Sequence, residues 1–258
     1  KTNPSIGADC MIETIIDIPT RDGLMETFIC RPERGAPAPA VFMLMDAPGI
    51  RDELHDMARR LATVGYAVLL PNLYYRAGLD TKYDPATVLE EGSPEHTRMR
   101  AVRTKMTIPP VMADLEDMFA FVDAEPAISS ERIGTHGYCM SGPFAIWAAA
   151  EFSDVVRAAA SFYGVRLHVE SPDSPHTRLG EIAGELYVGA AEHDDYVPLD
   201  MIDRFEAAMQ DSGVAGRVER YWGTHHGFAF DDRPAYNRSA DDRHWAALLD
   251  LFARNLQP

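Results

Sequence analysis

Residues 137–142 read Gly137-Tyr138-Cys139-Met140-Ser141-Gly142, and this stretch decides the fold. A short predicted strand at 132–136 precedes it, and an Ala-rich helical run through Glu151 follows it. Small residues two positions to either side of Cys139 allow a strand to turn sharply into a helix around an outward-pointing side chain. The stretch therefore predicts a nucleophile elbow that carries sulfur in place of oxygen.

Strands and helices are predicted to alternate on both sides of this elbow. Residues 41–45 and 67–70 are continuously apolar, as buried strands are, and Leu54, Met57, Leu61 and Val64 recur at helical spacing between them. This alternation predicts an α/β fold with a mostly parallel sheet covered by helices on both faces. The other predicted elements are a helix at 111–122, strands at 156–162, 186–189 and 218–222, and helices near 199–209 and 245–256.

The N-terminal part predicts a different local arrangement. Extended runs at 11–18 and 24–30, separated by a turn at Asp22-Gly23, predict an antiparallel hairpin at the sheet edge. Residues 77–107 are the least regular and are predicted to form a loop and short helix that roof the site. A chain of 258 residues with no internal repeat is expected to form one domain over 1–258.

Composition excludes several classes of protein. The chain has 24 Lys and Arg against 40 Asp and Glu, and the net charge of −16 argues against nucleic acid or anionic membrane as a partner. No apolar run approaches the roughly 18 residues of a membrane helix. The first residues do not have the pattern of a signal peptide, although a chain that starts with Lys1 leaves open the alternative of a removed leader.

The three cysteines, Cys10, Cys30 and Cys139, show no CxxC spacing. They indicate neither a disulfide framework nor a structural zinc site, and we expect a reducing, cytoplasmic location and no metal or organic cofactor. Cys10 and Cys30 have no flanking motif and are interpreted as core residues.

A thiol needs a base to become a good nucleophile at neutral pH. Asp194 and His226 each follow a predicted strand beyond the elbow, in the order nucleophile, acid, histidine. Cys139 would attack an acyl carbon, His226 would carry protons, and Asp194 would orient the imidazole. Backbone N–H groups of Met140 and Ala47 would stabilise the oxyanion.

Neighbouring residues compete for these roles. His225 and His193 are alternatives to His226, and Asp195 is an alternative to Asp194, although its position also suits a charge at a helix N-terminus. The position of His226 before Gly227-Phe228 favours that histidine.

At this point the sequence resembles a known family. The segments GYCMSG, HDDYVP and GTHHGF, together with residues 45–76, are similar to the dienelactone hydrolase family of α/β hydrolases, from about residue 11 to the C-terminus. The resemblance implies an esterase or lactonase whose triad is Cys139, His226 and Asp194. It also implies a carboxylate that accepts a hydrogen bond from the resting thiol, and the matching residue is Asp46, where well-known members have Glu.

The chain departs from the family at two places. Asp46 is one methylene shorter than Glu, and it is also suited to a plain turn before Pro48-Gly49. Dienelactone-degrading members carry an arginine close after the catalytic histidine, where this chain has Phe230. Candidates for a carboxylate clamp in the roof are Arg98, Arg100 and Arg103, which are equally readable as solvated helix charges.

The sequence therefore predicts a hydrolase that opens a small-molecule ester or lactone through an acyl-thioester, as a monomer or homodimer. Two alternatives belong to other classes. One is a cysteine-elbow amidotransferase, although Gly227-Phe228 stands where such proteins carry Pro and Glu. The other is a non-catalytic hydrolase-fold module that binds a small ligand.

Overall fold

One mostly parallel sheet organises the computed structural model, which describes residues 11–33, 36–78, 81–84 and 86–257. Within these residues eight strands lie in the order β1-β2-β4-β3-β5-β6-β7-β8. In chain order they are β1 (Met11–Thr20), β2 (Gly23–Pro32), β3 (Ala38–Leu44), β4 (Ala67–Pro71), β5 (Ile128–Tyr138), β6 (Val156–Phe162), β7 (Glu185–His193) and β8 (Ala215–His225). The expected core position of Cys10 lies outside the described residues.

The N-terminal hairpin is confirmed. β1 pairs with β2 in an antiparallel register from Met11↔Pro32 to Thr20↔Gly23, and β2 pairs antiparallel with β4. All further pairings, from β4 across to β8, are parallel. The parallel strands therefore end at one common edge, because their chain directions agree.

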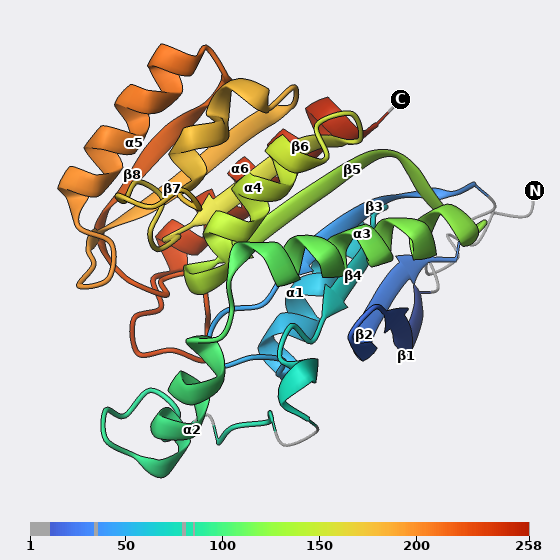
Figure 1. The fold of residues 1–258 in the computed structure, drawn as a ribbon, viewed down its shortest axis with the longest axis horizontal. Helices are drawn as coiled ribbons and strands as arrows, with labels where there is room; N and C mark the ends of the chain where they lie inside the picture. Colours follow the sequence, from blue (N-terminus) through green and yellow to red (C-terminus); the bar gives the residue numbers. More distant parts are fainter. Residues whose placement is uncertain (1–10, 34–35, 79–80, 85, 258) are drawn as a thin grey trace, which may run out of the picture.

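Helices cover both faces of this sheet (Figure 1). They are α1 (Asp52–Thr63), α2 (Pro94–Arg103), α3 (Ile108–Ala124), α4 (Gly142–Glu151), α5 (Leu199–Ser212) and α6 (Arg238–Leu256), with short 3₁₀ turns η1 (Tyr75–Ala77), η2 (Cys139–Ser141) and η3 (Pro175–Glu181). In the view of Figure 1, α3 and α4 lie in front of the sheet and α6 lies behind it. No helix in the described ranges is both long and apolar enough to cross a membrane.

The hydrophobic core lies between the sheet and these helices. The strands predicted to be buried are buried in the structure: Val41, Leu44 and Val68 are fully shielded from solvent. Cys30 is also a core residue, as expected, and burial raises the pKa of its thiol to about 11. The segment between η1 and α3 departs from this compact pattern, because α2 projects away from the sheet (Figure 1).

Close packing fixes the turn from β5 into α4. A Cβ added to Gly137 would lie only 2.4 Å from the carbonyl oxygen of Ser141, so only glycine fits there. The Ser141 hydroxyl accepts a hydrogen bond from the Tyr138 N–H at 2.9 Å, and it lies 2.9 Å from the carbonyl oxygen of Leu44 on β3. The elbow is thus tied to its own strand and to the neighbouring one.

Replacing Gly137 by alanine is expected to destabilise the fold by about 1–3 kcal/mol, because the new methyl group overpacks against backbone that has no room to move. Urea unfolding measures the loss. The matched control is Gly180→Ala, where an added Cβ meets no atom within 4 Å and little change is expected. Equal stabilities of the two variants would contradict the packing argument.

Candidate functional site

Four strand ends bring the predicted residues together at the carboxyl edge of the sheet. Cys139 follows β5 directly, Asp194 follows β7 and His226 follows β8. Asp46 and Ala47 lie in the loop after β3. Parallel strands place such loops side by side, which is why residues distant in sequence meet here.

The backbone at Cys139 is strained. Its φ is +54°, in the left-handed region that residues with a Cβ rarely adopt. Among the described residues, the other non-glycine positions with positive φ are Tyr163 at +40° and Arg166 at +57°, both just beyond β6. The Val165 N–H donates a hydrogen bond to the Cys139 carbonyl at 3.0 Å, which joins the two strained loops. Strain that is held by its surroundings is typical of functional sites.

Asp194 holds His226 in one orientation. The distance from His226 Nδ1 to Asp194 Oδ2 is 2.7 Å, and the Asp194 side chain is fully buried. The other carboxylate oxygen accepts hydrogen bonds from the N–H groups of Tyr196 and Val197 at 2.9 and 3.1 Å. Asp194 is therefore fixed by its own loop, and Nδ1 carries the proton that it accepts.

The opposite ring nitrogen of His226 is buried and has no hydrogen-bond partner within the described part of the chain. Burial alone would lower the pKa of His226, but the nearby Cys139 and the Asp194 carboxylate together raise it from 6.5 to about 10. A pKa of about 10 favours the charged imidazole at neutral pH, in which Nε2 carries a donor N–H.

The competing residues lie elsewhere. His225 and His193 are exposed and face each other, with their ring centroids 5.1 Å apart. Asp195 is also exposed. Among these candidates, the structure joins only Asp194 and His226 by an ion pair.

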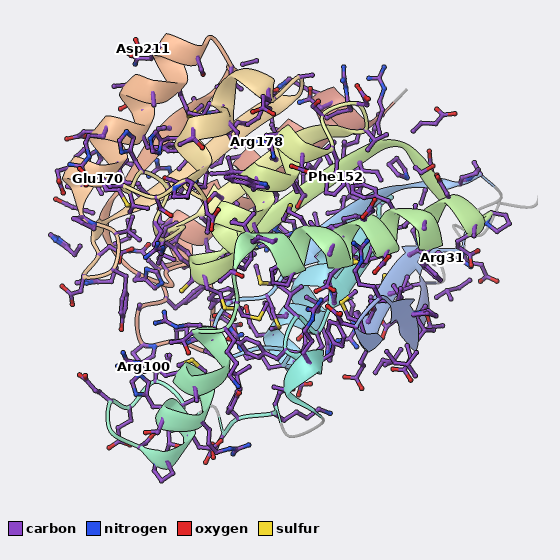
Figure 2. The ribbon with its side chains drawn as sticks, viewed as in Figure 1. Arg31, Arg100, Phe152, Glu170, Arg178 and Asp211 are labelled. Atoms are coloured by element: carbon purple, nitrogen blue, oxygen red, sulfur yellow. The ribbon has the colours of Figure 1, made fainter. Side chains whose placement is uncertain are left out.

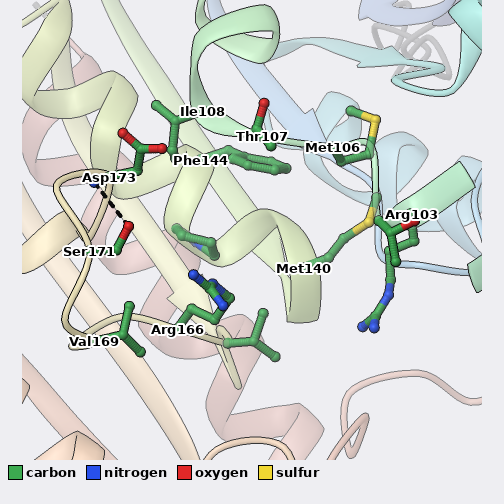
Figure 3. A pocket seen from close by; sticks show the side chains of 13 residues that line it. Arg103, Met106, Thr107, Ile108, Met140, Phe144, Arg166, Val169, Ser171 and Asp173 are labelled. Atoms are coloured by element: carbon green, nitrogen blue, oxygen red, sulfur yellow. Dashed lines mark hydrogen bonds between the residues drawn. The ribbon is translucent and has the colours of Figure 1, made fainter.

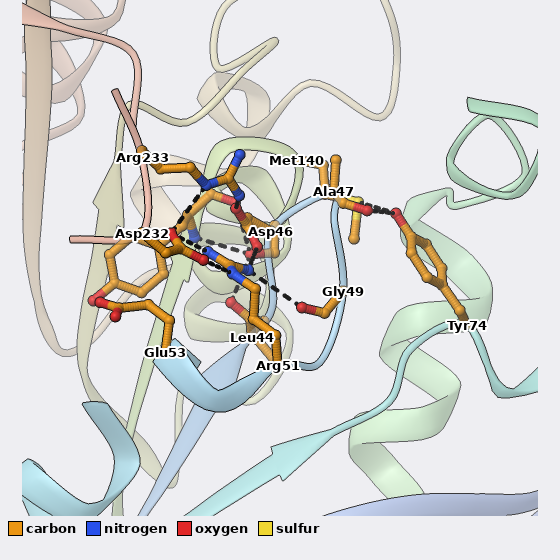
Figure 4. A network of polar contacts seen from close by, with 12 residues as sticks. Leu44, Asp46, Ala47, Gly49, Arg51, Glu53, Tyr74, Met140, Asp232 and Arg233 are labelled. Atoms are coloured by element: carbon orange, nitrogen blue, oxygen red, sulfur yellow. Dashed lines mark hydrogen bonds and ion pairs between the residues drawn. The ribbon is translucent and has the colours of Figure 1, made fainter. Parts of the chain in front are cut away.

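Asp46 is buried at the same edge but is paired with arginines rather than with the thiol (Figure 4). Arg51 reaches one carboxylate oxygen at 2.6 Å, and Arg233 reaches the other at 2.7 Å. Asp232 binds both arginines from the outside, at 2.5 Å to Arg51 and 3.2 Å to Arg233. No hydrogen bond joins Asp46 to Cys139 across the described residues, so the aspartate serves here as the centre of an ion-pair cluster.

The two expected oxyanion loops are connected by a tyrosine. The Tyr74 hydroxyl donates a hydrogen bond to the Ala47 carbonyl at 2.7 Å and lies 3.2 Å from the Met140 sulfur. The Ala47 N–H has no acceptor in the part of the chain that the structure covers. Met140 stands in the first turn after β5, where N–H groups lack a helical partner.

A cavity of about 420 Å³ lies next to the elbow (Figure 3). Met140 forms part of its wall, and Phe144 on α4 and Ile108 at the start of α3 form much of its apolar surface. Arg103 and Arg166 bring two positive charges to it, and Asp173 brings one negative charge. Neither arginine has an ion-pair partner in the residues that the structure describes.

Of the three roof arginines, only Arg103 lines this cavity. Arg98 is held at 2.6 Å by Glu95 and stacks on the ring of Tyr83. Arg100 is exposed on the projecting α2 (Figure 2). The helix that we expected to roof the site thus contributes its last residue, Arg103, to the wall of the cavity.

Three residues of the site escaped the sequence analysis. Arg233 comes three positions after Phe230 and stacks on that ring 5.6 Å from its centroid, while its guanidinium pairs with Asp46. Tyr163 and Arg166 follow the predicted strand 156–162 at the same edge as Cys139. The sequence signal that could have identified these two residues was their position directly after a buried strand.

A mostly parallel sheet with helices on both faces and a nucleophile elbow after its central strand defines the α/β hydrolases. Comparisons with known proteins narrow this class. The model of the dienelactone hydrolase family matches residues 25–256, and the chain belongs to that family. It is therefore a carboxylic ester hydrolase, of the lactone or ester type.

Similar proteins cover nearly the whole chain. Relatives named "Putative carboxymethylenebutenolidase" from Synechocystis sp. and Methylorubrum extorquens are 26% and 28% identical, over 95% and 98% of this chain and 97% and 84% of their own. The crystal structure of a "Putative Dienelactone Hydrolase" from Klebsiella pneumoniae aligns with a TM-score of 0.83 at 23% identity, covering 95% of this chain and 99% of that one.

Asp46→Asn is expected to lower the free energy of unfolding by about 3 kcal/mol, because two buried guanidinium groups lose their shared carboxylate. Denaturant unfolding measures it. Glu116→Gln, which removes the exposed partner of Arg21, is the control, with an expected loss below about 1 kcal/mol. Similar losses for both would show that the cluster is not structural.

The raised pKa of His226 predicts how stability changes with pH. A folded-state pKa of about 10 above an ordinary 6.5 means that this contribution is complete below pH 6.5 and is lost as the pH rises towards 10. The charge of Cys139 that raises this pKa offsets the proton gained by His226 near pH 7, so wild type should lose stability more steeply than His226→Gln only as the pH approaches 10. Parallel curves in thermal unfolding would refute the ion-pair environment.

Proposed function

We propose that this hydrolase cleaves carboxylic esters or lactones by attack of the Cys139 thiolate, with His226 as proton carrier and Asp194 as its orienting group. The observation that carries the proposal is the 2.7 Å contact between Asp194 and His226 beside a cysteine in strained left-handed geometry. A hydrogen-bonded acid and base next to a displayed nucleophile is the arrangement that acyl transfer requires.

Acylation proceeds in two steps, addition to the carbonyl carbon and collapse of the tetrahedral intermediate. The thiolate adds to the carbonyl carbon, and the C=O electron pair moves to oxygen, where the N–H groups of Met140 and Ala47 stabilise it. When the carbonyl re-forms, the C–O bond to the alcohol breaks. His226 Nε2 gives its proton to the leaving oxygen, which leaves a thioester on Cys139 and a neutral imidazole.

Deacylation reverses these roles with water. The neutral imidazole takes a proton from water as its oxygen adds to the thioester carbon. Collapse of this second intermediate expels the thiolate and releases the carboxylic acid. The charged His226 and the thiolate are then restored, so no cofactor enters the balance.

The cavity beside Met140 supports the substrate class. Its volume of about 420 Å³ accommodates a small molecule, and Phe144 and Ile108 give it an apolar section beside polar and charged side chains. Arg103 and Arg166 add positive charge to the same wall. The cavity favours a small ester or lactone with an apolar body.

Cys139→Ser should retain the fold and lose roughly 1,000-fold or more in kcat/KM on p-nitrophenyl acetate, since an alcohol forms no ion pair with His226. Intact-mass spectrometry of the wild type should trap one acetyl group on Cys139 at early times. Cys30→Ala, which changes a buried core thiol, serves as the control and should keep both turnover and acetylation. Near wild-type turnover in Cys139→Ser would mean that another residue is the nucleophile.

A further inference from the structure

Tyr163 shares two unusual properties with the residues of the site. It follows β6, the strand next to β5, and its φ of +40° makes it one of three non-glycine residues in the described chain with left-handed backbone. The other two are Cys139 itself and Arg166 in the cavity wall. Strained positions that cluster at one site argue for a role there rather than for packing alone.

The Tyr163 hydroxyl is buried without a partner. The residue is 0% exposed, and its oxygen makes no hydrogen bond within the described residues. Two other buried tyrosines are satisfied: Tyr138 bonds His244 at 2.9 Å, and Tyr187 bonds Tyr221 at 2.6 Å. An unpaired buried hydroxyl is unfavourable, so its retention calls for an explanation.

The ring of Tyr163 packs beside one of the reacting groups. Its centroid is 5.0 Å from that of His226, whose Nε2 is likewise buried without a hydrogen-bond partner among the described residues. Burial, Tyr138, Asp46 and Cys139 raise the pKa of Tyr163 well above its ordinary value, against the opposing effect of Arg233. The phenol therefore stays protonated and acts as a neutral donor.

We propose that Tyr163 is a further catalytic residue, whose hydroxyl donates a hydrogen bond to the leaving oxygen of the substrate. The inference rests on the proposed function, because it assigns the donor to a step of that reaction. The carbonyl oxygen has donors on Met140 and Ala47, whereas the leaving oxygen meets only His226. The Tyr163 ring packs against the imidazole that gives its proton to this oxygen.

The bond changes are those of the acylation step. As the C–O bond breaks, the electron pair moves onto the leaving oxygen, which accepts the hydrogen bond from Tyr163 and the proton from His226. Tyr163 keeps its own proton throughout. The benefit grows with the charge that the leaving oxygen gathers, so it is largest for alcohols of high pKa and small for p-nitrophenol.

Tyr163→Phe tests this role, because it removes the hydroxyl and nothing else. With ethyl acetate, kcat/KM should fall on the order of 100-fold, chiefly through kcat. With p-nitrophenyl acetate, the fall should be less than about threefold, since that group leaves without help. The melting temperature should stay unchanged or rise, because the variant loses an unpaired buried hydroxyl.

Tyr187→Phe is the matched control. It removes a buried hydroxyl that is bonded to Tyr221, so it should lower the melting temperature and leave both activities near wild type. Wild-type rates for Tyr163→Phe on ethyl acetate, or an equal loss on both esters, would overturn the role of Tyr163 while leaving the proposed function standing. If Cys139→Ala hydrolyses either ester as fast as wild type, both proposals fall.

Discussion

The site depends on one local constraint, the close contact between Gly137 and Ser141 that bends the chain after β5. With no Cβ at Gly137, the Ser141 backbone can sit against the strand, and its hydroxyl can bridge Tyr138 and Leu44. Cys139 is then left in a left-handed conformation that its own side chain disfavours. The sheet supplies the energy that keeps this geometry, because a displaced elbow would break contacts on two strands.

A second constraint is the buried ion-pair cluster around Asp46. Asp46 is buried between Arg51 and Arg233, and Asp232 binds both arginines from the solvent side. A single buried carboxylate beside two cations balances poorly, and the added aspartate improves that balance. The loop after β3, which carries Ala47, is thereby joined to the segment that follows His226. The arrangement couples the two loops that surround the reacting groups.

Much of the fold and of the site was predictable from the sequence. Physical reasons explain why the rest was not. Hydrophobic patterns located the strands, and β6 coincides with the predicted 156–162, because burial on both faces leaves a largely apolar run. Because parallel strands end at the same edge of a sheet, the predicted strands placed Cys139, Asp194 and His226 together at that edge. The partners of Asp46 were not predictable, since Arg233 reaches it only through the path of a loop that has no periodic pattern. The unpaired hydroxyl of Tyr163 was equally hidden, because hydrogen-bond satisfaction is a property of three-dimensional neighbours.

The ion pair between Asp46 and Arg233 spans 187 positions of the chain. During synthesis on the ribosome, Cys139 emerges well before His226 and Arg233 exist, so an unfinished molecule holds its sulfur without the imidazole. Under the mechanism proposed above, chemical competence arrives only with the last part of translation. Until then the growing chain carries a thiol that lacks its base, and such a thiol reacts more slowly than a thiolate.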